Sequence, residues 1–150
     1  MKISLNVREE SVQEVTRALR EEPVEITEEA PYILSEVTVS SGLLTVRDLK
    51  NEERVLVPLA DVVQFAAFGH TVEVRTREKI YSVSTPLYKL NEMLEERSFL
   101  RVSNSVIVAV GHIRQIKPTL SMRFILTMSD GSEADVTRSY YYAFKEYFHI

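Results

Sequence analysis

The chain has 150 residues, of which 45% are hydrophobic and 27% are charged, a composition typical of a folded protein with room for one full domain and a small additional piece. It has no cysteine, which excludes disulfides, thiolate metal sites and a cysteine nucleophile. The stretch after Met1 lacks the apolar run of a secretory signal, and the longest mostly apolar stretch, residues 55–74, is interrupted by Asp61, Gln64 and His70. We therefore expect a cytoplasmic protein without a membrane span.

The net charge of −4 at first argues against nucleic acid, because phosphate binding normally leaves a basic footprint. The charge is unevenly distributed, however. Residues 1–36 carry nine acidic and four basic side chains, whereas residues 97–150 carry seven basic and four acidic ones. An acidic front and a basic back are typical of a DNA-binding module joined to a separate interaction segment.

Residues 1–36 predict a small β-α-β piece. Apolar and polar residues alternate over 2–7, as in a half-buried strand. Ser11 and Glu14 have the spacing of a capping box at the start of an amphipathic helix. A second strand is expected over 24–27.

The predicted helix ends at Glu22 and Pro23, and the acidic stretch up to Pro31 predicts a linker or short turn. A piece of this size is too small to bury a core by itself. It must therefore pack against its own domain or against a partner subunit.

From Val37 onward the hydrophobic period is two, in short β-branched runs separated by Gly, Pro, Asn or Asp. This pattern is typical of an antiparallel β module. The clearest hairpin is predicted at Asp130 and Gly131, where an Asp-Gly pair between FILTM and EADVT favours a tight turn.

Two helices are expected within this β module. One has an apolar stripe at helical spacing, formed by Leu87, Leu90, Met93 and Leu94. The other is the closing segment SYYYAFKEYFHI, which packs Tyr141, Phe144 and Phe148 unless it is a frayed tail. The sequence thus predicts a mainly β fold of the α+β class, with an appendage over 1–36 and a β domain over 37–150.

Three blocks of residues between about Thr38 and Phe148 carry a specific pattern. In SFLRVSNSVIVAVGHIRQI, the residues that match are Phe99, Arg101, Ser105, Ile107, Val108, Ile113 and Ile116. A second block is the Asp130–Gly131 hairpin with the tail VTRSYYYAFK, and a third is the stretch 63–76 with Gly69, followed by Lys79-Ile80-Tyr81 and the Leu87 helix. Together the blocks resemble the LytTR family of DNA-binding domains, known from bacterial response regulators.

The resemblance implies an elongated stack of antiparallel sheets whose loops, rather than a recognition helix, enter successive grooves of the duplex. In this family a His, an Asn and an Arg in three loops make base contacts, and by motif register they fall on His70, Asn104 and Arg138. An arginine fork suits guanine O6 and N7, and an asparagine amide suits an adenine edge. Side chains near these loops are expected to touch phosphates, namely Arg101, Ser103, Ser105, Lys117, Arg123, Thr137 and Ser139.

The chain departs from the family pattern at two positions. Ala109 stands where asparagine is usual, and Ala66 stands where an acidic residue is common before the Gly69 turn. The amide that would hold a neighbouring loop or touch the duplex is absent at Ala109. This departure bears on affinity or sequence preference and leaves the predicted fold unchanged.

Each candidate contact also has a purely structural interpretation. His70 can be a simple turn residue, Asn104 a turn former that bonds its own backbone, and Arg138 a surface cation packed on an aromatic ring. His112 and His149 lack the spacing of metal ligands and are expected to be exposed to solvent.

The favoured function is a sequence-specific regulator of transcription that binds double-stranded DNA at direct repeats in promoters, with no cofactor, metal or small-molecule substrate. Residues 1–36 are too few for a phosphorylatable receiver, so we expect a stand-alone regulator. This segment would support homodimerisation or docking to an inhibitory partner such as a membrane protein.

Two rival classes remain. A β-rich protein-interaction module that has lost DNA binding is motivated by Ala66, Ala109 and the negative net charge. An enzyme is disfavoured, because the sequence has no Gly-rich phosphate loop, metal-ligand cluster, serine elbow or cysteine nucleophile.

Overall fold

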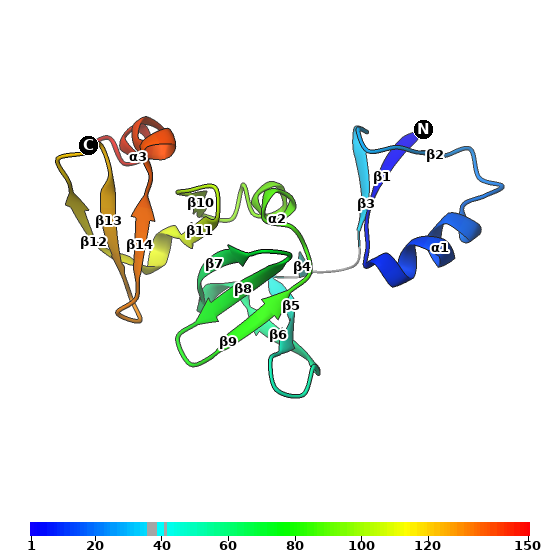
Figure 1. Ribbon diagram of the computed structural model, residues 1–150, viewed down its shortest axis with the longest axis horizontal. Coiled ribbons are helices and arrows are strands. Elements are labelled where there is room, and N and C mark those ends of the chain that lie inside the picture. Colours follow the sequence, from blue (N-terminus) through cyan, green and yellow to red (C-terminus); the bar gives the residue numbers. More distant parts are fainter. Residues whose placement is uncertain (36–38, 41) are drawn as a thin grey trace.

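The computed structural model describes residues 1–35, 39–40 and 42–150, which form three sheets (Figure 1). One small parallel sheet is built from the N-terminal residues, and two antiparallel sheets follow. The mainly β, α+β class predicted from the sequence is therefore confirmed. The expected boundary between residues 36 and 37 lies outside the described residues.

The N-terminal unit contains β1 (Lys2–Asn6), α1 (Glu9–Ala18), β2 (Glu25–Ile26) and β3 (Tyr32–Ser35). β1 lies between the other two strands and runs parallel to both. The strands expected over 2–7 and 24–27 are present. β3 was not predicted, because Tyr32, Ile33 and Leu34 are consecutive apolar residues without alternation, and all three are exposed.

The predicted capping box is wrong. α1 begins at Glu9, after Arg8 at the N-cap, with no side-chain capping bond, and Ser11 lies inside the first turn, where its N–H donates to the Arg8 carbonyl at 2.8 Å. Glu9 and Glu10 occupy the first turn, where the helix dipole favours negative charge. α1 ends at Ala18, earlier than expected, and none of its residues is buried.

Lys89 connects the N-terminal unit to the rest of the chain. Its Nζ donates to the Leu5 carbonyl at the end of β1, at 3.1 Å. The Lys89 side chain is buried, and this burial lowers the pKa of its ammonium group.

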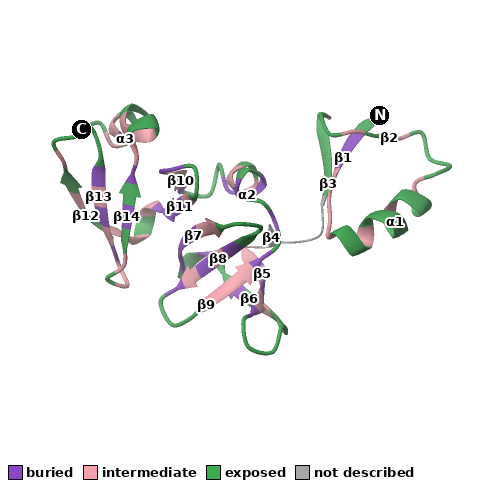
Figure 2. Cartoon of the chain, in the orientation of Figure 1, coloured by how far each residue is buried: buried purple, intermediate pink, exposed green. Residues whose placement is uncertain are grey.

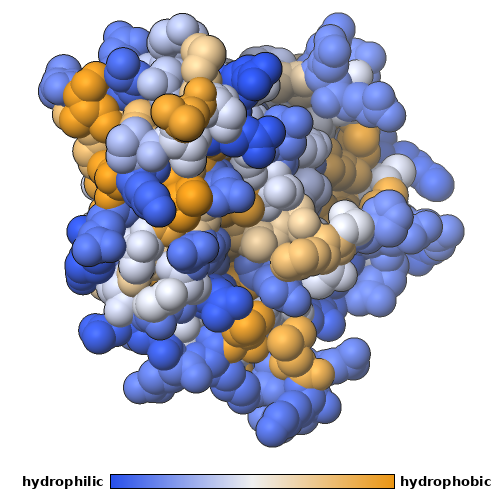
Figure 3. All heavy atoms as spheres, turned by 60° about the vertical axis from the view of Figure 1, so that its left-hand side comes forward, coloured by the Kyte–Doolittle hydropathy of each residue, from blue (hydrophilic) through white to orange (hydrophobic). Residues whose placement is uncertain are grey.

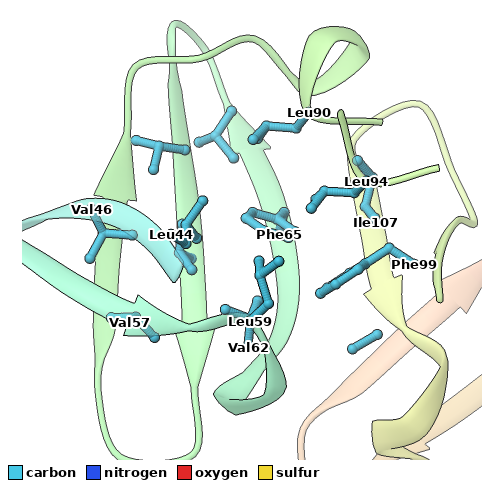
Figure 4. Close-up of a cluster of buried hydrophobic side chains, with 14 of the residues drawn as sticks. Leu44, Val46, Val57, Leu59, Val62, Phe65, Leu90, Leu94, Phe99 and Ile107 are labelled. Carbon is cyan, nitrogen blue, oxygen red and sulfur yellow. The ribbon is translucent and has the colours of Figure 1, made fainter. Parts of the chain in front are cut away.

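The first antiparallel sheet has the strand order β10-β11-β7-β8-β9-β5-β4, with β6 paired to β5. Its strands are β4 (Val39–Ser40), β5 (Leu43–Asp48), β6 (Arg54–Pro58), β7 (Val62–Phe68), β8 (Thr71–Thr76), β9 (Ile80–Val83), β10 (Phe99–Arg101) and β11 (Val106–Ala109). The short helices η1 (Leu59–Asp61) and α2 (Leu87–Met93) belong to it. The predicted helix at Leu87 is thus confirmed, and its Leu90, with the following Leu94, joins Phe65 and Ile107 in the first core (Figure 4).

The second antiparallel sheet has the order β12-β13-β14. Its elements are η2 (Val110–His112), β12 (Ile113–Pro118), β13 (Phe124–Met128), β14 (Glu133–Val136), η3 (Arg138–Tyr140) and α3 (Tyr141–Phe148). The predicted hairpin is confirmed: Gly131 has φ +84°, which favours glycine, and its N–H donates to the Met128 carbonyl at 3.0 Å. The closing segment is a helix and not a frayed tail.

The first four residues of β7 and the last three of β11 are buried (Figure 2), and they pack against both cores, which joins the two antiparallel sheets. Phe65 of β7 and Ile107 of β11 point into the first core. Their neighbours Val63 and Val108 point into a second core, with residues from β13, β14 and α3. The second sheet therefore packs on the reverse side of the strands that form the first core.

The packing of α3 gives a first prediction. Phe144 is 1% exposed and packs at tilted ring angles against Phe124 and Phe148, whereas Tyr142 on the same helix is 68% exposed. Phe144→Ala should lower the free energy of unfolding by about 3 to 5 kcal/mol, measured by urea denaturation. Tyr142→Ala is the matched control, and its effect should stay within about 0.5 kcal/mol. Equal effects would contradict the packing of α3 described here.

Candidate nucleic-acid interface

Strand register places the β7–β8 turn and the β10–β11 turn at the same end of the first sheet. Ala66 of β7 pairs with Val106 of β11, and the Ala67 N–H donates to the Ser105 carbonyl at 2.8 Å. His70 follows in the β7–β8 turn, and Asn104 lies in the β10–β11 turn. Both side chains are exposed.

The segment after β14 contacts the β10–β11 turn. The Thr137 N–H donates to the Val102 carbonyl at 3.0 Å, and the Tyr140 hydroxyl donates to Oδ1 of Asn104 at 3.1 Å. Arg138, between these two residues, is exposed. The register of β7 and β11 thus places the turns of His70 and Asn104 at one end of the first sheet, and these two bonds place the segment of Arg138 beside the Asn104 turn.

Arg101 and Ser103 hold the β10–β11 turn from within. The Arg101 guanidinium donates to the carbonyls of Ser103 and Asn104, at 3.1 and 2.8 Å. The Ser103 hydroxyl accepts the N–H of Ser105 at 3.2 Å, and Ser103 is 7% exposed. The contact of Ser103 with phosphate stays a prediction, although the residue is buried and its hydroxyl already bonds the turn. Arg101 uses two of its donors to fix the loop.

A shallow concavity lies between the β10–β11 turn and β14. It brings together most of the predicted contact residues: Ser103, Asn104, Ser105, Arg123, Thr137, Arg138 and Ser139. His70 is not part of its lining and reaches the same end of the sheet through the register of β7. Lys117 lies apart, on β12, which β13 separates from β14.

Acidic residues share this concavity. Glu133 and Asp135 alternate along β14 with the buried Ala134 and Val136, so the carboxylates face outward into the lining. They balance the two arginines of the lining. The concavity therefore offers donors and acceptors together, and it is not a simple basic patch.

A polar cluster fixes the second sheet on the first at the opposite end of β14. The Gln64 amide on β7 donates to the Ser132 hydroxyl at 2.9 Å, and that hydroxyl donates to Asp130 at 2.6 Å. Arg75 on β8 lies 4.0 Å from the other Asp130 oxygen. Burial alone would raise the pKa of Asp130, but the bonds from Ser132 and the Arg75 charge hold the pKa below its ordinary value.

His112 was expected to be exposed to solvent, and this prediction is wrong. Its Nε2 lies 2.6 Å from the Ala60 carbonyl, and its Nδ1 lies 2.6 Å from the Ser129 hydroxyl. A carbonyl only accepts, so Nε2 carries the proton and donates to Ala60. His112 thus bridges η1 and the β13–β14 turn. Sequence analysis missed it because both partners are distant along the chain. His149 is exposed, as expected.

The two departures from the family pattern lie at different places. Ala109 is 5% exposed in the first core and pairs with Phe99, at the opposite end of β11 from Asn104. Ala66 pairs with Val106 and Glu73 and is half-buried, close to the turn. Ala109 therefore has no direct place at the interface, whereas Ala66 borders it.

Other kinds of site have little support within the part of the chain that the structure describes. The described residues include no cluster of three His, Cys, Asp or Glu side chains arranged to hold a metal ion. Over the same residues, no helix has the length and apolarity to cross a membrane.

Comparisons with known proteins agree with this geometry. The sequence profile of the LytTr DNA-binding domain matches residues 52–149. A solved LytTr DNA-binding domain from Bacillus cereus superposes with a TM-score of 0.69 at 25% identity, covering 74% of this chain and 100% of that one.

Curated relatives match over part of the chain. The sensory transduction protein LytT of Bacillus subtilis is 31% identical over 99 residues, which are 66% of this chain and 41% of LytT. LytT of Bacillus cereus is 34% identical over 89 residues, 59% of this chain and 36% of that protein. LytR of Staphylococcus saprophyticus is 24% identical over 112 residues, 75% of this chain and 43% of that protein. The chain thus spans less than half the length of these relatives.

The Asp130 cluster gives a prediction on pH. Since the folded state lowers the pKa of Asp130, its contribution to stability is present above the ordinary pKa, about 3.9, and is lost as the pH falls through the lower folded value. Asp130→Asn should be less stable than wild type at pH 7 and should lose less stability between pH 5 and pH 2, as measured by urea denaturation. The exposed Asp61, changed to Asn, should retain the wild-type acid response. An unchanged acid response in Asp130→Asn would contradict the cluster.

Proposed function

The chain belongs to the LytTR DNA-binding domain family, and from this premise we propose that it is a sequence-specific, double-stranded DNA-binding regulator of transcription that reads bases through three turns. The observations that carry the proposal are the strand register that sets the exposed His70 and Asn104 at one end of the first sheet, and the bonds that hold the segment of the exposed Arg138 beside Asn104. No cofactor, small-molecule substrate or catalytic step belongs to this proposal, and the expected location is the cytoplasm.

Asn104 and Arg138 are the proposed base-reading residues. The Tyr140 hydroxyl occupies one lone pair of Asn104 Oδ1 and orients the amide. The amide N–H groups and the second lone pair then remain for a purine edge. The exposed Arg138 guanidinium suits guanine O6 and N7, a contact worth about 1 to 3 kcal/mol in discrimination. His70 in the neighbouring turn can meet a base edge or a phosphate.

Phosphate contacts are proposed for the polar residues around these tips. Ser105, Thr137, Ser139 and Arg123 line the concavity beside Asn104 and Arg138. Such contacts position the protein on the duplex and carry no sequence information. Lys117 on β12 would meet only a duplex that extends along the second sheet.

The N-terminal unit is proposed to mediate homodimerisation. Tyr32, Ile33 and Leu34 are 58%, 46% and 41% exposed on β3, which is an edge strand paired only with β1 among the strands that the structure describes. An apolar edge strand is a template for pairing with another chain. Two copies on direct-repeat half-sites would multiply a weak single-domain affinity. An inhibitory partner, such as a membrane protein, is the other proposed occupant of this edge.

A protein-interaction module that has lost DNA binding is the second candidate. The net charge of −4 and the carboxylates of Glu133 and Asp135 beside the arginines favour it. The two candidates differ in how binding responds to salt, because phosphate contacts release counterions and weaken steeply as salt rises.

Selection of bound duplexes from random DNA tests the proposal. The wild-type chain should enrich a sequence, and Arg138→Ala should weaken binding to it about 5- to 150-fold, the factor for losing a bidentate base contact. Arg54→Ala removes an exposed arginine on β6 and is the matched control, with affinity unchanged. The absence of any enriched sequence would leave only the interaction module.

Asn104→Ala gives an independent test by the same selection. Loss of the amide should relax the preference at one position of each half-site while the remaining positions stay enriched. Thermal denaturation should first establish that the variant folds. An unchanged preference would remove Asn104 from the proposed base contacts.

Sedimentation equilibrium of the full chain tests the dimer. The wild-type chain should sediment as a dimer, and Ile33→Glu on β3 should shift it to a monomer, because a charge on the apolar edge opposes strand pairing. Leu56→Glu, at a position 63% exposed on β6, should leave the dimer intact. A monomeric wild type would contradict homodimerisation.

A further inference from the structure

Phe68 is an aromatic side chain that neither core of the fold uses. It is the last residue of β7 and is 62% exposed, directly before Gly69 and His70 in the β7–β8 turn. It belongs to neither buried cluster. A ring left in water contributes little to stability, so packing does not account for phenylalanine at this position.

The face on which Phe68 lies is fixed by alternation along β7. Gln64, Ala66 and Phe68 are two residues apart and share one face. Gln64 on this face bonds Ser132 of the second sheet. Phe68 therefore lies on the side that carries the second sheet, at the end where the β10–β11 turn and Arg138 meet. Figure 3 shows that apolar side chains reach the surface in separate places among hydrophilic ones.

The neighbours of Phe68 determine which ligand it suits. Its strand partner at the turn is Thr71, the β10–β11 turn is held beside it by the bond from the Ala67 N–H to the Ser105 carbonyl, and Asn104 of that turn lines one concavity with Arg138. Amide and guanidinium groups recognise base edges in the major groove. An apolar ring among them cannot donate to bases or phosphates. The apolar group that the major groove offers is the C5-methyl of thymine.

We propose that Phe68 is a specificity-determining residue whose ring contacts the C5-methyl group of a thymine beside the bases read by Asn104 and Arg138. This inference rests on the proposed function and adds a base preference to it. Phe68 thereby makes the site selective for thymine over cytosine at one position of each half-site.

Replacement of thymine by uracil tests the contact, because it removes the methyl group and leaves the pairing unchanged. In a duplex recovered by selection, each thymine is replaced in turn, and affinities are measured for the full-length chain and for Phe68→Ala. At one thymine per half-site, the wild type should lose about fourfold in affinity, the factor for one methyl-sized group. Phe68→Ala should bind the thymine and uracil duplexes equally.

Two further variants complete the experiment. Phe68→Leu keeps an apolar side chain and should retain a measurable preference for thymine over uracil. Leu56→Ala removes an apolar residue on β6 that is as exposed as Phe68. This variant should keep the full wild-type preference for thymine over uracil. Both Phe68 variants should melt at the wild-type temperature, since the ring is exposed.

The outcomes separate this inference from the function on which it rests. If wild type and Phe68→Ala both bind the selected duplex, and each uracil replacement changes their affinities by the same factor, the Phe68 contact is overturned and the DNA-binding function stays intact. The contact would also be overturned if no uracil replacement changed the affinity of the wild type, or if the selected sequence contained no thymine. Failure to select any duplex would overturn both.

Discussion

The arrangement of the whole molecule depends on the burial of β7 and β11 on both faces. Phe65 and Ile107 fill the first core from one side of these strands, and Val63 and Val108 fill the second core from the other. Because the same two strands serve both cores, the second sheet cannot shift without losing apolar burial that also positions the first. The turns that end or precede these strands are the ones that carry His70 and Asn104, and the sheet packed behind them carries Arg138. A rigid interface therefore follows from the core and not from the loops themselves.

Polar contacts fix the orientation of the second sheet on the first, which apolar packing alone leaves undetermined. At one end of β14, Gln64 and Arg75 hold the β13–β14 turn through Ser132 and Asp130. At the other end, the Thr137 N–H bonds the Val102 carbonyl. Each of these hydrogen bonds contributes only about 1 kcal/mol to the stability of the fold. Together they fix one orientation of the second sheet among the several that apolar packing alone would allow.

The parts that could be predicted from the sequence are those determined locally. Asp130 and Gly131 form the expected hairpin turn because only their own backbone is involved. The helix at Leu87 and Leu90 could be predicted because the helical spacing of its apolar residues is visible in the local sequence, although its stability comes from packing in the first core. The capping box failed because acidic residues at the start of α1 provide an alternative helix start. The bridging role of His112 and the inward hydroxyl of Ser103 could not be predicted, because each depends on partners that only the folded chain brings near. The family pattern located the candidate turns, and the structure distinguished residues that hold them from residues that point outward.

We expect the turns of His70 and Asn104 and the segment of Arg138 to form one DNA-reading face. Amide chemical-shift mapping of the full chain during titration with a selected duplex reports every backbone position at once. The large shifts should cluster at residues 68–71, 103–106 and 137–140, with little change in α1 or β6. Large shifts confined to the N-terminal unit, or spread over both sheets without a maximum at these turns, would contradict it.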